Sequence, residues 1–535
     1  MRIAKSFCLF AAMLLFACHA GAAYSESSVN RLFILGGELS NSAATSVEDI
    51  DEVMPRMAAL GLNTVLVPAY WDLIEPVEGQ YDWTLVDRVI DKARECKLQV
   101  VFLWFGVWKN SMSCYAPLWF KQDVKRFPRA MTRSGKPLEI ASAFSEQVFQ
   151  ADCKVFTRLV EHLAQKDPLK KTVIMLQIEN EIGMLEDARD HSPQAEAIHR
   201  KSKYPDTLEG DEAFMAEHYA RYVERLAQVA RRIYDVPLYV NAAMNSRGRK
   251  PGEYPSAGPL AHLAPIWKNY APSIDMLAPD IYDTGFKGWA RQYALPDNPL
   301  FIPESRCCEN SGVRALYTFG AYDAIGFSPF AIDQSPTEDT KHVTAAYDLI
   351  RQMKKYLLKT REQAWKKGRW QQDNGLWGVL FDREDREEII EDGNLAMTCR
   401  HYFTLPWDAR AKADVWAEGG AIIYKVSTYE YLIAGSGVVV EFKTKSEQQQ
   451  EERKNLGEDG FVDKGTSTSA SGSTKENVRW QGKRIGIGYV DQVEIADDGR
   501  MKYIRRDNGD QDHQGRHARI SVGDYKILHV KLYDY

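Results

Sequence analysis

The sequence lacks the short motifs that mark several common enzyme classes. It contains no glycine-rich phosphate-binding loop, no zinc-protease helix and no GxSxG turn for a serine nucleophile. No cofactor is therefore implied. His513 and His517 lie four residues apart, but their glycine-rich segment offers no third ligand, so we expect no metal there.

Cysteine is scarce. Of the eight cysteines, Cys8 and Cys18 lie in the N-terminal apolar stretch, and the spacing of the other six matches no zinc-binding pattern. We interpret Cys96 and Cys153, in helix-like segments, as buried free thiols. Spacing alone does not reveal the pairing of the remaining four, Cys114, Cys307, Cys308 and Cys399.

Basic residues are not in excess. The formal charge is −6, and it becomes −8 without the leader residues Arg2 and Lys5. A protein that binds nucleic acid neutralises phosphates with a surplus of lysine and arginine, so we expect no nucleic-acid partner.

Long apolar runs are absent beyond the N-terminus, so no membrane span is expected. Residues 1–23 combine two basic residues, an apolar stretch and a small-residue site near Ala23, which is the pattern of a secretory signal. The segment LFAC, ending at Cys18, could instead be a lipoprotein cleavage site, although Phe16 is bulky for that role. We expect export to the periplasm or extracellular space, either free or as an outer-membrane lipoprotein.

A repeated pattern fills residues 24–340, where short apolar, β-branched runs alternate with amphipathic helical segments. The runs are RLFILGGE, NTVLVPAYW, LQVVFLWFG, TVIMLQIENE, PLYVNAAM, IDMLAPDIY, PLFIPES and AIGFSPFAID. Eight such units predict an α/β fold, a (β/α)8 TIM barrel. The alternative, an open doubly wound sheet, concentrates its site at one switch point, whereas every run here ends in polar or aromatic residues.

The pattern changes after residue 340. Residues 341–370 are expected to form a helical connection, and residues 371–535 contain short strand-like runs with glycine-rich turns. These runs predict a C-terminal all-β sandwich domain. Residues 444–477 are too polar to pack, and we interpret them as a mobile insertion between strands.

Two of the predicted strands end in carboxylates. The fourth run ends in Glu179, Asn180 and Glu181, and the seventh leads into Glu304. In a barrel, the ends of strands four and seven face each other across the mouth, so a small ligand could lie between Glu181 and Glu304. Either glutamate alone could be an ordinary helix cap. Together they predict hydrolysis of a glycosidic bond, which needs an acid and a second carboxylate.

One of the two carboxyl groups must hold its proton at neutral pH while the other stays charged. Burial and mutual repulsion favour the protonated form of one, and hydrogen bonds from Tyr282 and Arg306 would stabilise the charged form of the other. A retaining enzyme holds the two groups about 5 to 5.5 Å apart, and an inverting enzyme about 6.5 to 9.5 Å. Strand parity leaves open whether Glu179 or Glu181 is the acid.

The segments QIENEIG and YWDLIEPVEGQYDW, with the glutamate after strand seven, resemble the retaining glycoside hydrolases of clan A. The likeness covers residues 32–335 and is closest to the β-galactosidases of family 35, with features of family 42. The C-terminal RRDNGDQDHQGRH resembles the β-sandwich of a bacterial branch of family 35. The resemblance implies that Glu181 is the general acid/base, Glu304 the nucleophile, Asn180 a contact to the sugar 2-hydroxyl and Glu179 a supporting residue.

The third strand departs from family 35, which carries a GPYICAEW-type segment where this chain has LWFGVWKNSMSCYAP. The sugar contacts of that strand are therefore not carried over. We expect Trp104 and Trp108 to stack on a sugar ring, and Lys109 and Asn110 to bind hydroxyls. Packing within the barrel loops is the alternative for the two rings.

Other polar residues at strand ends are further candidates for binding substrate. Glu38 and Asn41 follow the first strand and could reach a sugar hydroxyl, as could Glu75 after the second. Glu75 could equally be a solvated carboxylate in a turn marked by proline and glycine. Asn241, on the fifth strand, is a weaker candidate.

The sequence thus predicts an exported, cofactor-free, retaining exo-β-galactosidase whose partner is a carbohydrate, the galactosyl end of an oligosaccharide or polysaccharide side chain. Other specificities of the same machinery stay open, namely β-glucosidase, β-xylosidase and α-L-arabinopyranosidase. A catalytically silent carbohydrate-binding protein is the alternative from another class.

Overall fold

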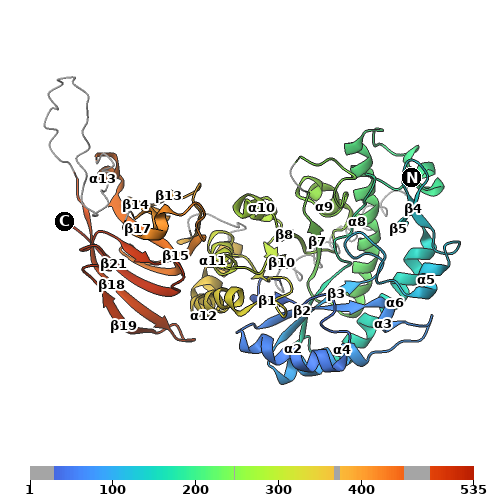
Figure 1. Ribbon diagram of the computed structural model, residues 1–535, viewed down its shortest axis with the longest axis horizontal. Coiled ribbons are helices and arrows are strands. Elements are labelled where there is room, and N and C mark those ends of the chain that lie inside the picture. Colours follow the sequence, from blue (N-terminus) through green and yellow to red (C-terminus); the bar gives the residue numbers. More distant parts are fainter. Residues whose placement is uncertain (1–28, 246–247, 367–373, 406, 451–481) are drawn as a thin grey trace, which may run out of the picture. The chain divides into compact units, whose positions relative to one another are not determined.

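A computed structural model describes residues 29–245, 248–366, 374–405, 407–450 and 482–535 (Figure 1). The chain divides into two compact units. The first contains the chain through Arg306 together with Ile325–Ser335, and the second contains Cys307–Ala324 and Pro336–Tyr535. The expected signal, with Cys18, lies outside the described residues, as does most of the expected insertion at 444–477.

The first unit is the predicted (β/α)8 barrel. Its strands are β1 (Ile34–Glu38), β2 (Thr64–Tyr70), β3 (Gln99–Phe105), β6 (Val173–Gln177), β7 (Leu238–Ala243), β8 (Met276–Ile281), β9 (Phe301–Ile302), β10 (Glu304–Ser305) and β11 (Gly326–Phe327). They form one parallel sheet in the order β10-β8-β7-β6-β3-β2-β1-β11-β9. Each of the eight predicted runs supplies its strand.

The seventh strand is interrupted at Pro303, between β9 and β10. The first half, β9, pairs with β11, and the second half, β10, pairs with β8. This strand therefore closes the barrel. Proline has no N–H to donate to a neighbouring strand, so an interruption at this position is physically expected.

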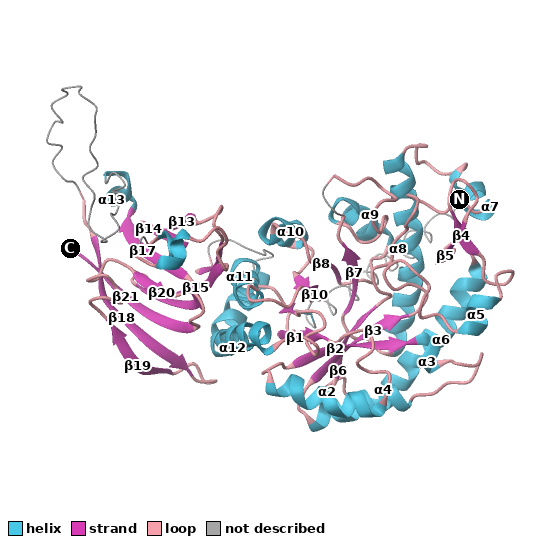
Figure 2. Cartoon of the chain, viewed as in Figure 1, coloured by secondary structure: helices cyan, strands magenta, loops and turns pink. Residues whose placement is uncertain are grey.

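Helices cover the outside of the barrel strands (Figure 2). They are α2 (Val47–Ala59), α3 (Trp71–Ile74), α4 (Thr84–Glu95), α5 (Leu118–Gln122), α6 (Glu146–Lys166), α7 (Pro193–His199), α8 (Leu208–Ile233), α9 (Ala264–Tyr270) and α10 (Phe286–Tyr293), with the hairpin β4 (Arg129–Met131) and β5 (Pro137–Ala141) and the 3-10 turn η1 (Ala261–Leu263). In α4 the buried residues Val86, Val89, Ile90 and Ala93 recur every three or four positions, which gives the helix one apolar stripe. Strands β2 and β6 are buried along their whole length, as strands covered on both faces should be.

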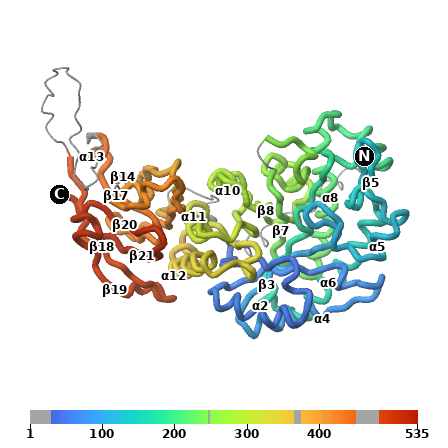
Figure 3. The backbone as a smooth tube through the Cα atoms, viewed as in Figure 1, coloured from blue at the N-terminus to red at the C-terminus, as the bar shows by residue number. Residues whose placement is uncertain are grey.

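The second unit contains helices and the predicted sandwich (Figure 3). Its helices are α11 (Ser311–Tyr322), α12 (Thr337–Lys366) and the short α13 (Lys445–Gln450), with the 3-10 turns η2 (Tyr402–Thr404) and η3 (Ala409–Lys412). Its strands are β12 (Leu376–Phe381), β13 (Glu387–Asp392), β14 (Leu395–His401), β15 (Gly419–Ser427), β16 (Glu430–Ser436), β17 (Val438–Thr444), β18 (Ile485–Ile495), β19 (Met501–Asp507), β20 (Ala518–Ile520) and β21 (Lys526–Asp534).

The strands of the second unit form two antiparallel sheets, β12-β15-β16-β21-β18-β19 and β13-β14-β17-β20. One apolar cluster takes residues from both sheets, among them Phe381 and Val530 from the larger and Met397 and Val440 from the smaller. Such a shared core is the defining feature of a β-sandwich.

Cys96, Cys114, Cys153, Cys308 and Cys399 are free thiols, and Cys96 and Cys153 are half-buried rather than buried. Among the described residues, no helix has both the length and the apolar character needed to cross a bilayer.

Candidate active site

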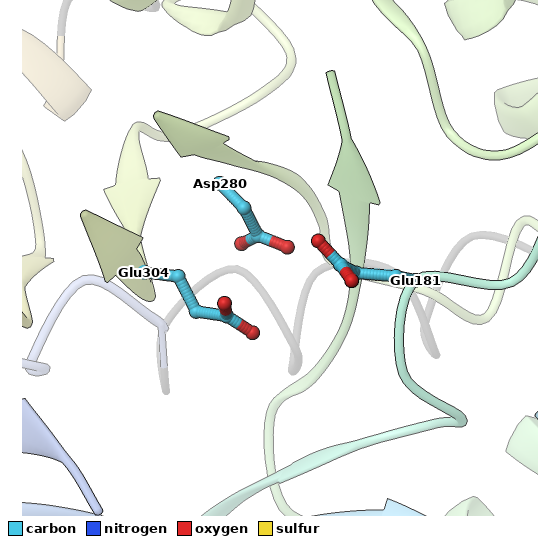
Figure 4. A group of neighbouring side chains, drawn as sticks. All are labelled: Glu181, Asp280 and Glu304. Atoms are coloured by element: carbon cyan, nitrogen blue, oxygen red, sulfur yellow. The ribbon is translucent and has the colours of Figure 1, made fainter. Parts of the chain in front are cut away.

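Glu181 and Glu304 lie together at the carboxyl ends of the barrel strands, as expected from the ends of strands four and seven. Glu181 follows β6, and Glu304 opens β10. One carboxyl oxygen of each lies within 4.8 Å of the other, and an oxygen of Asp280, on β8, lies within the same distance of both (Figure 4). Glu181 is 5% exposed and Glu304 3% exposed. The site therefore has a third carboxyl group that the sequence did not reveal.

Three side chains donate hydrogen bonds to Glu304. The Tyr282 hydroxyl donates to Oε2 over 2.8 Å, and the side-chain amides of Asn180 and Asn241 each donate to Oε1 over 3.3 Å. Donors of this kind stabilise a carboxylate in its charged form. Tyr282 was predicted for this role. Arg306, the other predicted donor, has an exposed side chain at the end of the strand.

Asn241 connects the three carboxyl residues. Its Oδ1 accepts the backbone N–H of Glu181 over 2.9 Å, and its Nδ2 donates to Asp280 Oδ2 over 2.7 Å as well as to Glu304. The sequence showed Asn241 only as a weak candidate, because these contacts depend on which strand ends become neighbours.

The environment of Glu181 suits a group that both gives and takes a proton. Burial, followed by the negative charge of Glu304, raises the pKa of Glu181 to about 7, although Lys109 and hydrogen bonds from Asp280 and Asn110 oppose the rise. The Asn110 side-chain amide donates directly to Oε2 of Glu181. A pKa near the working pH is what general acid/base catalysis requires.

Lys109 is the cation of the site and is 4% exposed. Burial alone would lower the pKa of its ammonium, but the four carboxyl groups of Glu304, Glu181, Glu38 and Asp280 outweigh burial and raise it. Lys109 therefore carries its charge at neutral pH. A single ion could also reach an oxygen from each of the three clustered carboxyl groups. Lys109 already supplies positive charge at this point, and we assign no metal role.

Glu38, on β1, is fully buried, and neither of its carboxyl oxygens meets a hydrogen-bond donor within the described part of the chain. Burial, followed by the charge of Glu304, raises its pKa well above the ordinary value. Glu38 stays a predicted contact to a sugar hydroxyl. Asn41 is partly exposed, and its Oδ1 is buried without a partner in the described chain.

Two tryptophans expected to stack on a sugar are instead buried against the helices α6 and α8. Trp108 is 0% exposed, and its ring packs edge-on against Tyr222 and Tyr219, with centroid distances of 4.7 Å and 5.4 Å. Trp104 is buried against Phe156. The stacking prediction is therefore wrong for both rings, because neighbouring aromatic side chains cover them.

Glu75 is neither a sugar contact nor a solvated turn residue. It is 1% exposed, and its carboxylate accepts the Trp71 indole N–H over 2.9 Å and the Gly79 backbone N–H over 2.7 Å. These hydrogen bonds therefore stabilise the turn after β2.

Glu179 belongs to a different carboxyl pair from Glu181. Its Oε2 accepts the backbone N–H of Trp108 over 2.8 Å, and its carboxyl group interacts with that of Asp152 on α6. Asp152 also accepts from Trp104 Nε1 over 2.9 Å and from the Tyr222 hydroxyl over 2.8 Å. Burial, followed by the charge of Asp152, raises the pKa of Glu179 well above its ordinary value, so this buried pair favours holding a proton.

The backbone around this pair is constrained. Glu179 and Glu181 adopt left-handed φ angles of 57° and 45°, which non-glycine residues rarely take. A Cβ atom on Gly106 would lie 2.8 Å from Glu179 Oε1 and 2.2 Å from Trp104 Nε1, so only glycine fits there. The Glu179 side chain therefore packs closely against Gly106 at the turn that leads to Glu181.

Two family models match separate parts of the chain. Residues 41–229 match the family model described as "Beta-galactosidase", and residues 343–519 match one described as "Domain of unknown function (DUF5597)". The comparison with curated proteins gave no match.

Two solved structures are similar to this chain. The "Polyextremophilic Beta-galactosidase from the Antarctic haloarchaeon Halorubrum lacusprofundi" is 16% identical, with a TM-score of 0.43 over 60% of this chain and 58% of that one. The β-galactosidase from the psychrophilic Marinomonas ef1 is 12% identical, with a TM-score of 0.46 over 60% of each chain. The chain thus spans less than two thirds of the length of either protein. The barrel and the match over residues 41–229 support a clan A glycoside hydrolase and do not single out family 35.

Proposed function

We propose that this protein is a retaining, exo-acting β-galactosidase. The observation that carries the proposal is the close approach of Glu181 and Glu304, whose oxygens lie within 4.8 Å. This distance favours retention, for which the carboxyl groups are about 5 to 5.5 Å apart, over inversion, which needs about 6.5 to 9.5 Å. Galactose as the sugar rests on the description of the matching family and on the sequence resemblance.

In the first step, a Glu304 carboxylate oxygen forms a bond to the anomeric carbon while the bond to the leaving oxygen breaks. Glu181 gives its proton to that oxygen. Three donors, Tyr282, Asn180 and Asn241, hold the Glu304 carboxylate ready for the attack.

In the second step, Glu181 is a carboxylate and takes a proton from water. The water oxygen bonds to the anomeric carbon, and the bond to Glu304 breaks. The bond from Glu304 to the sugar removes the negative charge of Glu304. Because that charge raises the pKa of Glu181, the pKa falls only after Glu181 has acted as the acid.

The proposal is tested with nitrophenyl β-galactoside, β-glucoside, β-xyloside and α-L-arabinopyranoside. Purified protein should prefer the galactoside, and proton NMR should show the β-anomer of the sugar as the first product. Glu181→Gln and Glu304→Gln should lose activity, while Glu186→Gln, a change to an exposed glutamate that pairs with Lys136, should not. An α-anomer as the first product would contradict retention, and no turnover of any glycoside would favour a carbohydrate-binding protein.

We also propose that the chain is exported, on the basis of residues 1–23. Fractionation of cells that express the full chain, with and without Cys18→Ala, distinguishes a free exported protein from a lipoprotein.

A further inference from the structure

Asp280 is a buried carboxyl group of the site that the mechanism above does not use. It is 1% exposed, and its Oδ2 accepts a hydrogen bond from Asn241 Nδ2. Its Oδ1 meets no donor among the residues that the structure describes. The carboxyl group points toward that of Glu181 (Figure 4), and an oxygen of each lies within 4.8 Å of the other.

Two carboxyl groups can share a hydrogen bond only if one of them carries a proton. If Asp280 were ionised, its buried Oδ1 would have no hydrogen-bond donor. A buried polar group without a partner costs about 1 to 3 kcal/mol of free energy, and a charged group costs more. As an acid, Asp280 turns the same oxygen into a donor with Glu181 as its acceptor. The hydrogen-bonding pattern therefore favours the protonated form.

The surrounding charges favour the same form. The ionisable groups that face Asp280 are Glu304 on β10, Glu181 after β6, Glu38 on β1, Lys109 after β3, Tyr239 on β7, Tyr282 after β8 and Tyr293 on α10. Only Lys109 in this set is a cation. Burial, followed by the charges of Glu304 and Glu181, raises the pKa of Asp280 well above its ordinary value.

We propose that Asp280 stays protonated throughout the reaction and donates its hydroxyl to Glu181, as a positioning residue for the acid/base. This inference rests on the proposed role of Glu181. The Asp280 proton is not transferred: Glu181 gives its own proton to the leaving oxygen and regains one from water. The donated hydrogen bond stabilises the Glu181 carboxylate that forms between the two steps.

Two variants separate this role from a general structural one. In Asp280→Asn the side-chain amide can still accept a hydrogen bond from Asn241 and donate one to Glu181. If Asp280 is neutral, the substitution also changes no charge. The alkaline limb of the pH–kcat/KM profile should therefore stay in place. In Asp280→Ala the donor is lost, so kcat should fall about 10- to 100-fold and the limb should move to higher pH. The proposal is overturned if Asp280→Asn moves the limb to lower pH, as removal of a negative charge would, or if Asp280→Ala changes neither quantity.

A measurement without turnover keeps this inference separate from the proposed function. Infrared difference spectra of wild type against Asp280→Asn at pH 7 should show the loss of one protonated-carboxyl C=O band. The exposed change Asp297→Asn is the matched control and should leave that band unchanged. If Asp280→Asn removes only carboxylate bands, Asp280 is ionised and the inference fails, whatever the protein hydrolyses.

Discussion

The Tyr282 hydroxyl donates a hydrogen bond to Oε2 of Glu304 over 2.8 Å. Tyr282 follows β8, while the other oxygen binds Asn180, which follows β6, and Asn241, which lies on β7. The carboxylate at the centre of the site is thus held by three neighbouring strands of the barrel.

Replacing Tyr282 with phenylalanine should slow the first chemical step. A hydrogen bond to a charged group contributes about 1.5 to 3 kcal/mol, which corresponds to a fall in kcat/KM of about 10- to 150-fold. Steady-state kinetics with a nitrophenyl galactoside measure the change, with Tyr503→Phe, at a 59% exposed tyrosine of the sandwich, as the control. Equal kcat/KM values for both variants would contradict a role for Tyr282 in holding Glu304.

Activity should fall as the pH rises above about 7. Burial and the charge of Glu304 raise the pKa of Glu181 to about 7, and Glu181 must be protonated to act as the acid. A pH–kcat/KM profile with an unactivated galactoside should therefore lose activity above this value. With a substrate whose leaving group departs without a proton, the pH–kcat/KM profile of Glu181→Gln should show no such loss of activity. A limb that persists in Glu181→Gln would assign it to another group.

Asn241→Ala should lower both activity and stability. The change removes the acceptor for the Glu181 backbone N–H and the donor to Asp280 and Glu304, so we expect a fall in kcat of more than about 100-fold and a loss of about 2 to 4 kcal/mol of unfolding free energy. Asn298→Ala is the control, because the side chain of this buried asparagine binds backbone groups of Leu277 and Tyr293. It should destabilise the fold similarly but retain kcat.

Asp152→Asn should make stability less dependent on pH. Burial raises the pKa of Asp152 from 3.8 to about 6 in the folded protein, so the folded state holds a proton that the unfolded chain has released. The stabilisation is complete below about pH 4 and is lost as the pH rises through 6, by on the order of 3 kcal/mol. Urea unfolding at pH 4 and pH 7 should show a smaller decline for the variant. An equal decline in both proteins would contradict the raised pKa.

The sequence predicted the barrel because each strand is a short apolar, β-branched run, a pattern that depends on local burial alone. It also predicted that Glu181 and Glu304 would meet, since the ends of strands four and seven face each other in any such barrel. The break at Pro303 has a local cause as well, the missing N–H of proline.

The remaining site residues depend on contacts that no local pattern encodes. Asp280 and Asn241 lie on strands beside those of the two glutamates, and their roles appear only when the side chains of four strands are placed together. Trp108 seemed free to stack because it follows a strand, but Tyr219 and Tyr222 from the distant α8 cover its ring. The alternation of side chains along a strand could not show whether Glu179 or Glu181 is the acid. The structure distinguishes them, because Glu179 interacts with the buried Asp152 rather than with Glu304.

The central claim is that Glu304 attacks the sugar while Glu181 supplies the proton. It is tested most directly by incubating the protein with a 2-deoxy-2-fluoro-β-galactoside that has a reactive leaving group, followed by mass spectrometry of the digested chain. We expect one fluorogalactosyl group, attached to the peptide that contains Glu304, and no label on Glu304→Gln. A label on another carboxyl group, or turnover by Glu304→Gln at the wild-type rate, would contradict the account.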